Sequence, residues 1–237
     1  DWAVELTGGI DVQETCVYWV IRAWGEHWTS QCIARGQELN LWKTDEIMNL
    51  NYEKRDGTKL SPSLVLVDSG DQTDKVYDFC VDTADYTLPS KGASRKLETD
   101  YKFSVINKTG SRANGTTLVI IDTAKYKDRI AAKMQRENGT GAWMVFDGID
   151  DDYARQVTSE HKISERQANG SKVMKWVQKS AHRDNHYLDA EVYAMAAADI
   201  RGARTWHLER CEPEQRKTES ISKEEQWIQE NELEGWI

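Results

Sequence analysis

The sequence predicts a mixed α/β domain that begins with an antiparallel meander and continues with helices that cross over the sheet. Three β-rich runs, VELTGGIDVQ, CVYWVIRAWG and HWTSQCIARGQ, are joined by short polar or glycine-containing links, which is typical of a meander. The apolar run LVLV at 64–67 has the composition of a central strand that is covered on both faces. An alanine-rich segment, DNHYLDAEVYAMAAADIRG, predicts a long helix that closes the body.

The other elements follow from local patterns along the chain. Four large apolar residues predict a helix over 41–54. The long helix can be capped by Asp184 or Asn185, and Gly202 marks its end. Between these two helices we expect, in order, the strand SLVLVDSG, a helix over 74–81, strands over 86–91 and at TTLVIIDT, a helix over 126–135, a strand at AWMVFDG, a helix leading into a strand across DDDYARQVTSEHKI, and a strand at GSKVMKWVQK.

Composition divides the chain into a body, residues 1–203, and an acidic tail, residues 204–237. The tail is rich in Glu, Gln, Lys and Ser, and residues 209–237 carry nine Asp or Glu against four Lys or Arg. Ser222 and Glu225 have capping-box spacing, but the large apolar residues that follow do not gather on one helical face. We interpret the tail as an anchor for a partner, with a disordered end as the alternative.

Charge is unevenly distributed, although the whole chain carries −9. Residues 86–136 carry eleven Lys or Arg against four Asp or Glu, and residues 162–183 carry six against one. Such local fields favour binding to phosphates, whereas solvated surface lysines are the alternative. The candidate DNA contacts in these segments are Arg95, Lys96, Lys172 and Lys175.

Composition also argues against several classes of protein. No apolar run approaches the length of a membrane span, so no membrane partner is expected. The four cysteines lie too far apart for a zinc-ligand pair or a disulfide framework, which favours reduced thiols. The chain begins at Asp1, directly before the first strand, and we interpret it as a domain of a longer protein.

Three aspartates occupy unusual places in this plan. Asp11 ends the first strand, Asp68 ends the run LVLV, and Asp189 lies near the start of the last helix. If the two strands are neighbours, Asp11 and Asp68 emerge side by side at one edge of the sheet, where open α/β sheets place their sites. A helix packed there brings Asp189 to the same place.

Converging carboxylates repel one another unless cations neutralise them. Oxygen ligands without His or Cys suit Mg²⁺ or Mn²⁺, and a pair of such ions supports in-line displacement at a phosphodiester. A cap or turn role is the alternative for any one of these aspartates. Asp71 can likewise hold a water near the site or form a turn.

Four segments resemble landmarks of a known family in the same order: GIDVQ, VDSGDQTDKVYDFC, KGAS and DNHYLDAEVYAMAAA. Over about residues 5–203 the chain resembles the nuclease domain of the large terminase subunit of tailed bacteriophages, in the lambda-like branch. The resemblance implies a ribonuclease H-like fold and a metal-dependent endonuclease that cuts double-stranded DNA concatemers during genome packaging. We expect Mg²⁺ or Mn²⁺ as the cofactor, with two ions when DNA is bound, and the sequence leaves open how many ions bind without DNA.

The resemblance also implies roles for individual residues. Lys91, in KGAS, matches a landmark associated with DNA contact, and Glu160 matches an acidic position but can equally pair with a lysine. Where the family often has Asn-Glu, this chain has Asn185 and His186, which leaves the role of an acid there open. The implied catalytic and metal-binding triad is Asp11, Asp68 and Asp189. The secondary candidates are Asp71, Glu160, Asp184 and His186.

Partners and location follow from the same resemblance. Double-stranded DNA, the portal protein, the small terminase subunit and an ATPase domain are the expected partners, in the host cytoplasm at the procapsid. The sequence has no G-x-x-x-x-G-K-[ST] motif, so the ATPase is expected outside this chain. Two alternatives remain: a junction resolvase or transposase-like nuclease with the same triad, and a non-catalytic docking module.

Overall fold

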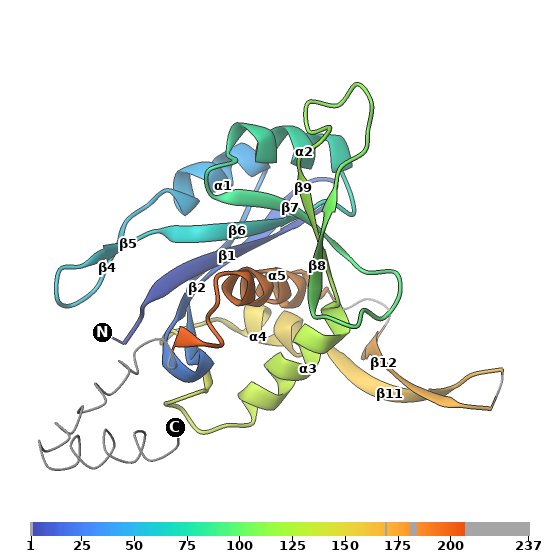
Figure 1. The fold of residues 1–237 in the computed structure, drawn as a ribbon. Coiled ribbons are helices and arrows are strands. Elements are labelled where there is room, and N and C mark those ends of the chain that lie inside the picture. Colours follow the sequence, from blue (N-terminus) through green and yellow to red (C-terminus); the bar gives the residue numbers. More distant parts are fainter. Residues whose placement is uncertain (1, 169, 181–183, 207–237) are drawn as a thin grey trace, which may run out of the picture. The chain divides into compact units, whose positions relative to one another are not determined.

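A computed structural model describes residues 2–168, 170–180 and 184–206 of the chain. Its centre is an eight-stranded mixed sheet in the order β10-β3-β2-β1-β6-β7-β9-β8 (Figure 1). The strands of this sheet are β1 (Glu5–Val12), β2 (Val17–Trp24), β3 (Ser30–Glu38), β6 (Pro62–Asp68), β7 (Thr87–Gly92), β8 (Tyr101–Val105), β9 (Thr117–Ile121) and β10 (Trp143–Val145). Two short ribbons pair β4 (Tyr52–Glu53) with β5 (Lys59–Leu60), and β11 (Glu160–Arg166) with β12 (Lys172–Gln178).

Helices cover both faces of the sheet. They are α1 (Leu41–Met48), α2 (Thr73–Asp82), α3 (Thr123–Met134), α4 (Asp151–Val157) and α5 (His186–Ile200). In Figure 1, α1 and α2 lie on one side of the sheet, and α3, α4 and α5 lie on the other. Strands β1, β2 and β3 form an antiparallel meander, and β6, β7 and β9 continue the sheet in parallel from β1. The predicted mixed α/β class with its initial meander is therefore confirmed.

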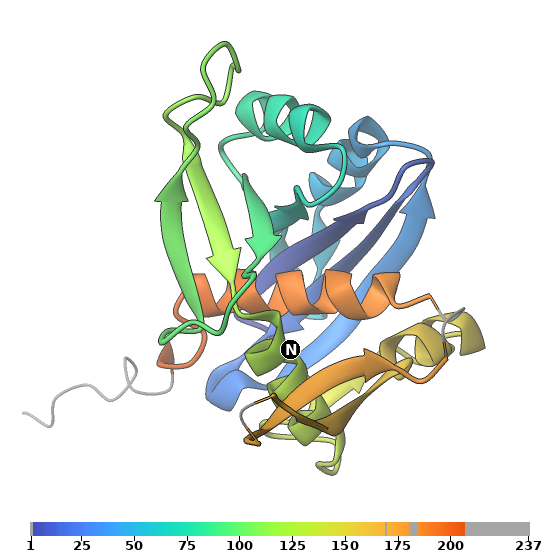
Figure 2. The ribbon, with the colours of Figure 1, turned by 90° about the vertical axis from the view of Figure 1, so that its right-hand side faces the viewer.

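Helix α5 is the central helix of the body. It runs across the strands (Figure 2), and twelve of its fifteen residues are buried. Small side chains allow it to approach β1 very closely: a Cβ atom at Gly9 would lie only 1.9 Å from the carbonyl oxygen of Ala190. The glycine in the strand and the alanines in the helix therefore set the distance between these two elements.

A buried ion pair joins α5 to the meander. The guanidinium of Arg22 donates to both carboxylate oxygens of Glu191 at 2.7 and 2.9 Å, and both side chains are fully buried. The hydroxyl of Tyr153 also donates to Glu191, and the guanidinium lies 3.2 Å from the ring centre of Trp143. Two charges in the core are thus compensated by hydrogen bonds and a stacked aromatic ring.

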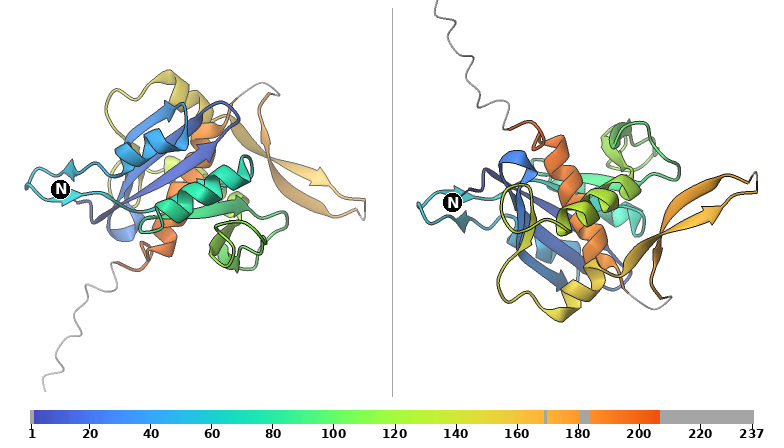
Figure 3. Two further views of the ribbon diagram at one scale, coloured as in Figure 1. Left: turned by 90° about the horizontal axis from the view of Figure 1, so that it is seen from above. Right: turned by 90° about the horizontal axis from the view of Figure 1, so that it is seen from below.

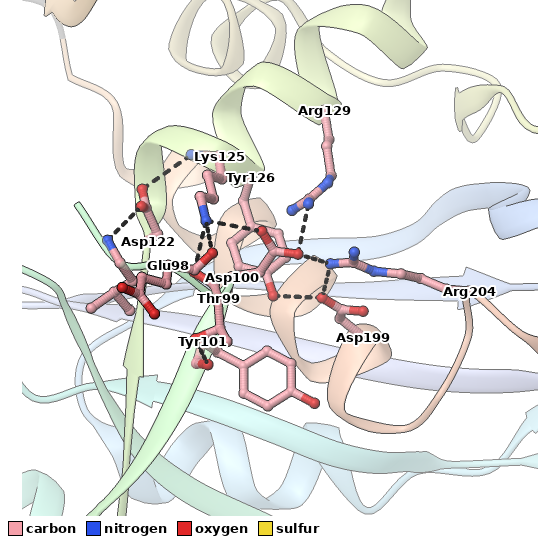
Figure 4. A network of polar contacts seen from close by, with 11 residues as sticks. Glu98, Thr99, Asp100, Tyr101, Asp122, Lys125, Tyr126, Arg129, Asp199 and Arg204 are labelled. Atoms are coloured by element: carbon pink, nitrogen blue, oxygen red, sulfur yellow. Dashed lines mark hydrogen bonds and ion pairs between the residues drawn. The ribbon is translucent and has the colours of Figure 1, made fainter.

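A second polar network holds the other end of α5 (Figure 4). Asp199 accepts hydrogen bonds from the hydroxyl of Tyr126 at 2.7 Å and from Arg204. Arg204 also donates to Asp100, which accepts a further hydrogen bond from Arg129 at 2.6 Å. These contacts tie the end of α5 to α3 and to the segment before β8.

The structure differs from the sequence-based plan in a few places. The helix predicted over 41–54 ends at Met48, and Tyr52 already lies in β4. Strand β8 was not predicted, although its sequence YKFSV alternates apolar and polar residues; the run is only five residues long, and the structure leaves most of it exposed at the edge of the sheet. The chain is still packed at Trp206, which is 8% exposed. The acidic tail from residue 207 onward, including Ser222 and Glu225, lies outside the described residues, so the boundary after 203 stays a prediction.

Among the helices that the structure describes, none has the length and apolar character needed to cross a membrane.

Candidate active site

The three predicted aspartates come from three elements that are in contact. Strands β1 and β6 are parallel neighbours at the centre of the sheet, with Ile10 opposite Val67. Asp11 and Asp68 are the next residues on these two strands, so they lie side by side where the strands end. Asp189 lies in the first turn of α5, which packs on β1. The negative charges of Asp68 and Asp189 both raise the pKa of Asp11, and the charge of Asp189 also raises the pKa of Asp68.

Asp11 is the most buried of the three, with 4% of its surface exposed. Burial raises its pKa to about 6, and the charges of Asp189 and Asp68 add to the effect. Two side chains orient the carboxylate: Nδ1 of His186 lies 2.9 Å from Oδ2, and Nε2 of Gln13 donates to the same oxygen at 2.7 Å. An ionised Asp11 is therefore undercompensated and would gain from a cation.

Asp68 accepts hydrogen bonds only from uncharged groups among the described residues, and the positive charge of Lys91 lowers its pKa from farther away. Its Oδ1 accepts a hydrogen bond from the backbone N–H of Gly70 at 2.9 Å, and the buried hydroxyl of Tyr193 donates to the same carboxylate. Burial raises the pKa of Asp68, and these two hydrogen bonds only partly oppose the increase. Tyr193 did not stand out in the sequence; the available signal is its position four residues after Asp189, on the same side of a helix.

Asp189 differs because a lysine contacts it directly. Nζ of Lys127, from α3, lies 2.9 Å from Oδ1 of Asp189 and 2.8 Å from Oε1 of Glu160. Asn185 donates to both carboxylates at 2.8 Å. Burial lowers the pKa of Lys127, but the two carboxylates outweigh it, so the pKa is raised. Lys127 was not predicted from the sequence, because nothing local distinguishes it from the other lysines of its segment.

The secondary candidates divide into two groups. Glu160 shares Lys127 with Asp189, and together with Asp11 and Asp68 these carboxylates form the acidic cluster. His186 contacts this cluster at Asp11, and its ring stacks on Tyr18 with 4.5 Å between the ring centres. The hydrogen bond to Asp11 raises the pKa of His186. Asp71 is exposed and accepts from the N–H of its neighbour Gln72, as a turn residue does. Asp184 is exposed and lies 3.9 Å from Nε2 of His186.

The chemistry of this donor set fits Mg²⁺ or Mn²⁺. The acidic side chains present only carboxylate oxygens, and the ammonium of Lys127 already occupies a position between two of them, as a cation would. As the side chains stand, the described residues contain no group of three or more His, Cys, Asp or Glu arranged to hold a metal ion. Asp11 and Asp68, which have no direct Lys or Arg partner in the described part of the chain, are the residues that would hold one.

The candidate DNA contacts lie around this edge and on the β11–β12 ribbon. Lys91 is in β7, one residue beyond the position opposite Asp68, while Arg95 and Lys96 are exposed in the loop that follows. The ribbon extends away from the sheet and helices (Figure 3) and begins at Glu160, which is part of the acidic cluster.

Register places the basic residues of the ribbon on different faces. Lys172 pairs with Arg166, and because paired residues share a face, Lys162 belongs to the same face through its partner Trp176. Lys175 points to the opposite face and lies 3.9 Å from Glu165. The two lysines predicted together on this strand are therefore separated by the alternation of the strand.

The eight-stranded mixed sheet with its initial meander and flanking helices defines a class, the ribonuclease H-like domains. Residues 1–209 match the family described as terminase large subunit gpA, endonuclease domain, and the chain belongs to this family. The large terminase subunit of Escherichia phage lambda is 30% identical over 228 residues, which cover 88% of this chain and 34% of the relative. The chain thus spans about a third of the length of that relative. No solved structure matches the chain. The family predicted from the four sequence landmarks is confirmed.

Proposed function

We propose that this chain is a divalent-metal-dependent endonuclease that cleaves double-stranded DNA, and that its substrate is the concatemer cut during viral genome packaging. The observation that carries the proposal is the meeting of Asp11, Asp68 and Asp189 at one edge of the sheet. Family membership supports it, because the family is defined as an endonuclease domain.

In this proposal, Asp11 and Asp68 hold the metal, and Asp189 completes the site. Mg²⁺ or Mn²⁺, acting as one of a pair when DNA is bound, supplies a Lewis acid that activates water and stabilises the leaving oxygen. His186 fixes the orientation of the Asp11 carboxylate, and Tyr193 does the same for Asp68. Both carboxylates are thereby aligned before the substrate arrives, which lowers the cost of reaching the reactive geometry.

DNA binding would depend on phosphate contacts. Lys91, Arg95 and Lys96 follow the acidic edge along the chain, and Lys172 faces the same side of the ribbon as Arg166. Contacts of this kind give an affinity that falls with salt and carries little sequence preference. Selection of the cleavage site would therefore come from other subunits.

Substitution of the three aspartates tests the proposal. Asp11→Asn, Asp68→Asn and Asp189→Asn should each remove most plasmid cleavage in Mg²⁺ or Mn²⁺ while circular dichroism shows an intact fold. Asp85→Asn is a matched control, because Asp85 is exposed and precedes the start of β7, whereas Asp68 lies opposite the other end of that strand. Near-normal cutting by any two of the three triad variants would overturn the assignment.

The packaging context is part of the proposal. Its partners would be the portal protein, the small terminase subunit and an ATPase domain, in the host cytoplasm at the procapsid. The similarity to the large terminase subunit of phage lambda supports this context. A resolvase-like nuclease would instead prefer branched over linear duplex DNA, and a docking module would show no metal-dependent nicking, so both alternatives can be tested with the same protein.

A further inference from the structure

Among the described residues, a lysine contacts the acidic cluster directly on one side only. Lys127 Nζ lies between Glu160 and Asp189 at 2.8 and 2.9 Å, and its side chain is 10% exposed. The two carboxylates come from different elements, β11 and α5, and the lysine from a third, α3. Three separate parts of the fold thus converge on one ammonium group.

The other side of the cluster has no contacting Lys or Arg among the described residues, although the charge of Lys91 acts on Asp68 from farther away and lowers its pKa. Asp11 is contacted by Gln13 and His186, and Asp68 by the Gly70 N–H and by Tyr193. In the part of the chain that the structure describes, no Lys or Arg forms an ion pair with either aspartate. The carboxylates at the ends of β1 and β6 are therefore the ones left to attract an added cation.

We propose that Lys127 is a built-in cation of the nuclease site, which restricts the DNA-free protein to one divalent ion, held by Asp11 and Asp68. The inference rests on the proposed metal-dependent function and concerns how that metal is loaded. A second ion near Asp189 would have to displace an ammonium that makes two short ion pairs, and two cations close together repel each other. The additional negative charge of a DNA phosphate would favour entry of a second ion, which ties full loading to substrate.

Counting bound Mn²⁺ tests this directly. Electron paramagnetic resonance of free Mn²⁺, titrated against the DNA-free chain, should give one bound ion for the wild type. Lys127→Gln, which removes the charge, should bind two. Lys127→Arg, which keeps the charge, should return the count to one. Lys125→Met is the matched control, because Lys125 lies on the same helix but bonds to the carbonyls of Glu98 and Thr99, outside the cluster.

Thermal unfolding provides a second readout. Without its lysine the pair of Glu160 and Asp189 is uncompensated, so Lys127→Gln should melt lower than the wild type in chelator and show a larger upward shift on adding Mn²⁺. Lys125→Met should show the wild-type shift.

The outcomes separate this inference from the proposed function. Two ions bound to the DNA-free wild type would overturn the inference alone, and this measurement does not depend on any variant folding. One ion in both the wild type and Lys127→Gln would also overturn it. Absence of Mn²⁺ binding by the wild type would count against both the inference and the metal-dependent nuclease.

Discussion

Gly9→Ala should damage both the stability and the active site of this protein. A Cβ atom at this position would lie 1.9 Å from the carbonyl oxygen of Ala190 and 2.6 Å from the amide nitrogen of Ala194. Real Cβ contacts essentially never fall below 3.0 Å, so α5 must move away from β1 by about 1 Å or more. Both contacted groups are backbone, which prevents relief by a change of rotamer.

The size of the effect follows from this displacement. Overpacking of a well-filled core costs about 1–3 kcal/mol, and contact with rigid backbone places Gly9→Ala at the upper end of that range. Ala190 directly follows Asp189, so the turn that is pushed away carries a triad residue. A displacement of about 1 Å at a reacting centre can reduce the rate about 100-fold.

Gly8→Ala is the matched control. Its Cβ atom would meet side-chain atoms and no backbone: Val65 Cγ2 at 3.0 Å, Met48 Sδ at 3.1 Å and Val65 Cγ1 at 3.2 Å, a crowding that a small shift of the flexible methionine and of the valine methyls can relieve. Urea denaturation should show a loss of less than about 1 kcal/mol for Gly8→Ala. Plasmid cleavage in Mn²⁺ should stay near normal for this control and fall steeply for Gly9→Ala. Equal stability and equal cleavage for the two variants would refute the role assigned to the contact between β1 and α5.

Three further predictions concern other residues. Because the folded pKa of Asp11, about 6, lies above its ordinary value of 3.8, this carboxyl costs the metal-free fold stability progressively as the pH rises from 3.8 to about 6, and the full cost applies above that. Asp11→Asn should therefore raise the free energy of unfolding by up to about 3 kcal/mol at pH 7.5 in chelator and change it little at pH 4; a loss at pH 7.5 would contradict this. Glu191→Ala leaves Arg22 buried and unpaired, so urea denaturation should show a loss of about 3–5 kcal/mol, and a loss below 1 kcal/mol would contradict the buried pair. Lys172→Ala should reduce the salt dependence of DNA binding by about one phosphate contact in fluorescence anisotropy, whereas Lys175→Ala, on the opposite face, should change it less; equal slopes would count against the assignment of faces.

Local patterns were enough to predict most elements and part of the site. The polar links of the meander, the run LVLV and the alanine-rich helix each have a signal within a short window of sequence. Asp11 and Asp68 could be placed at one edge because each ends a strand, and the only further condition was that the two strands are neighbours. Strand β8 was missed although YKFSV alternates apolar and polar residues, because five residues are too few for that alternation to stand out from a loop.

Contacts between distant segments decided the rest. Whether Asp189 reaches the strands depends on Gly9, which lies 180 residues earlier and allows α5 to approach β1. Lys127 meets Asp189 and Glu160 only because α3, α5 and β11 converge, and no spacing along the chain distinguishes it from the lysines beside it. The sequence by itself determined which side chains end the strands, since that follows from local periodicity. The charges that surround them were decided by tertiary structure, because electrostatic interaction depends on distance in space and not on separation along the chain.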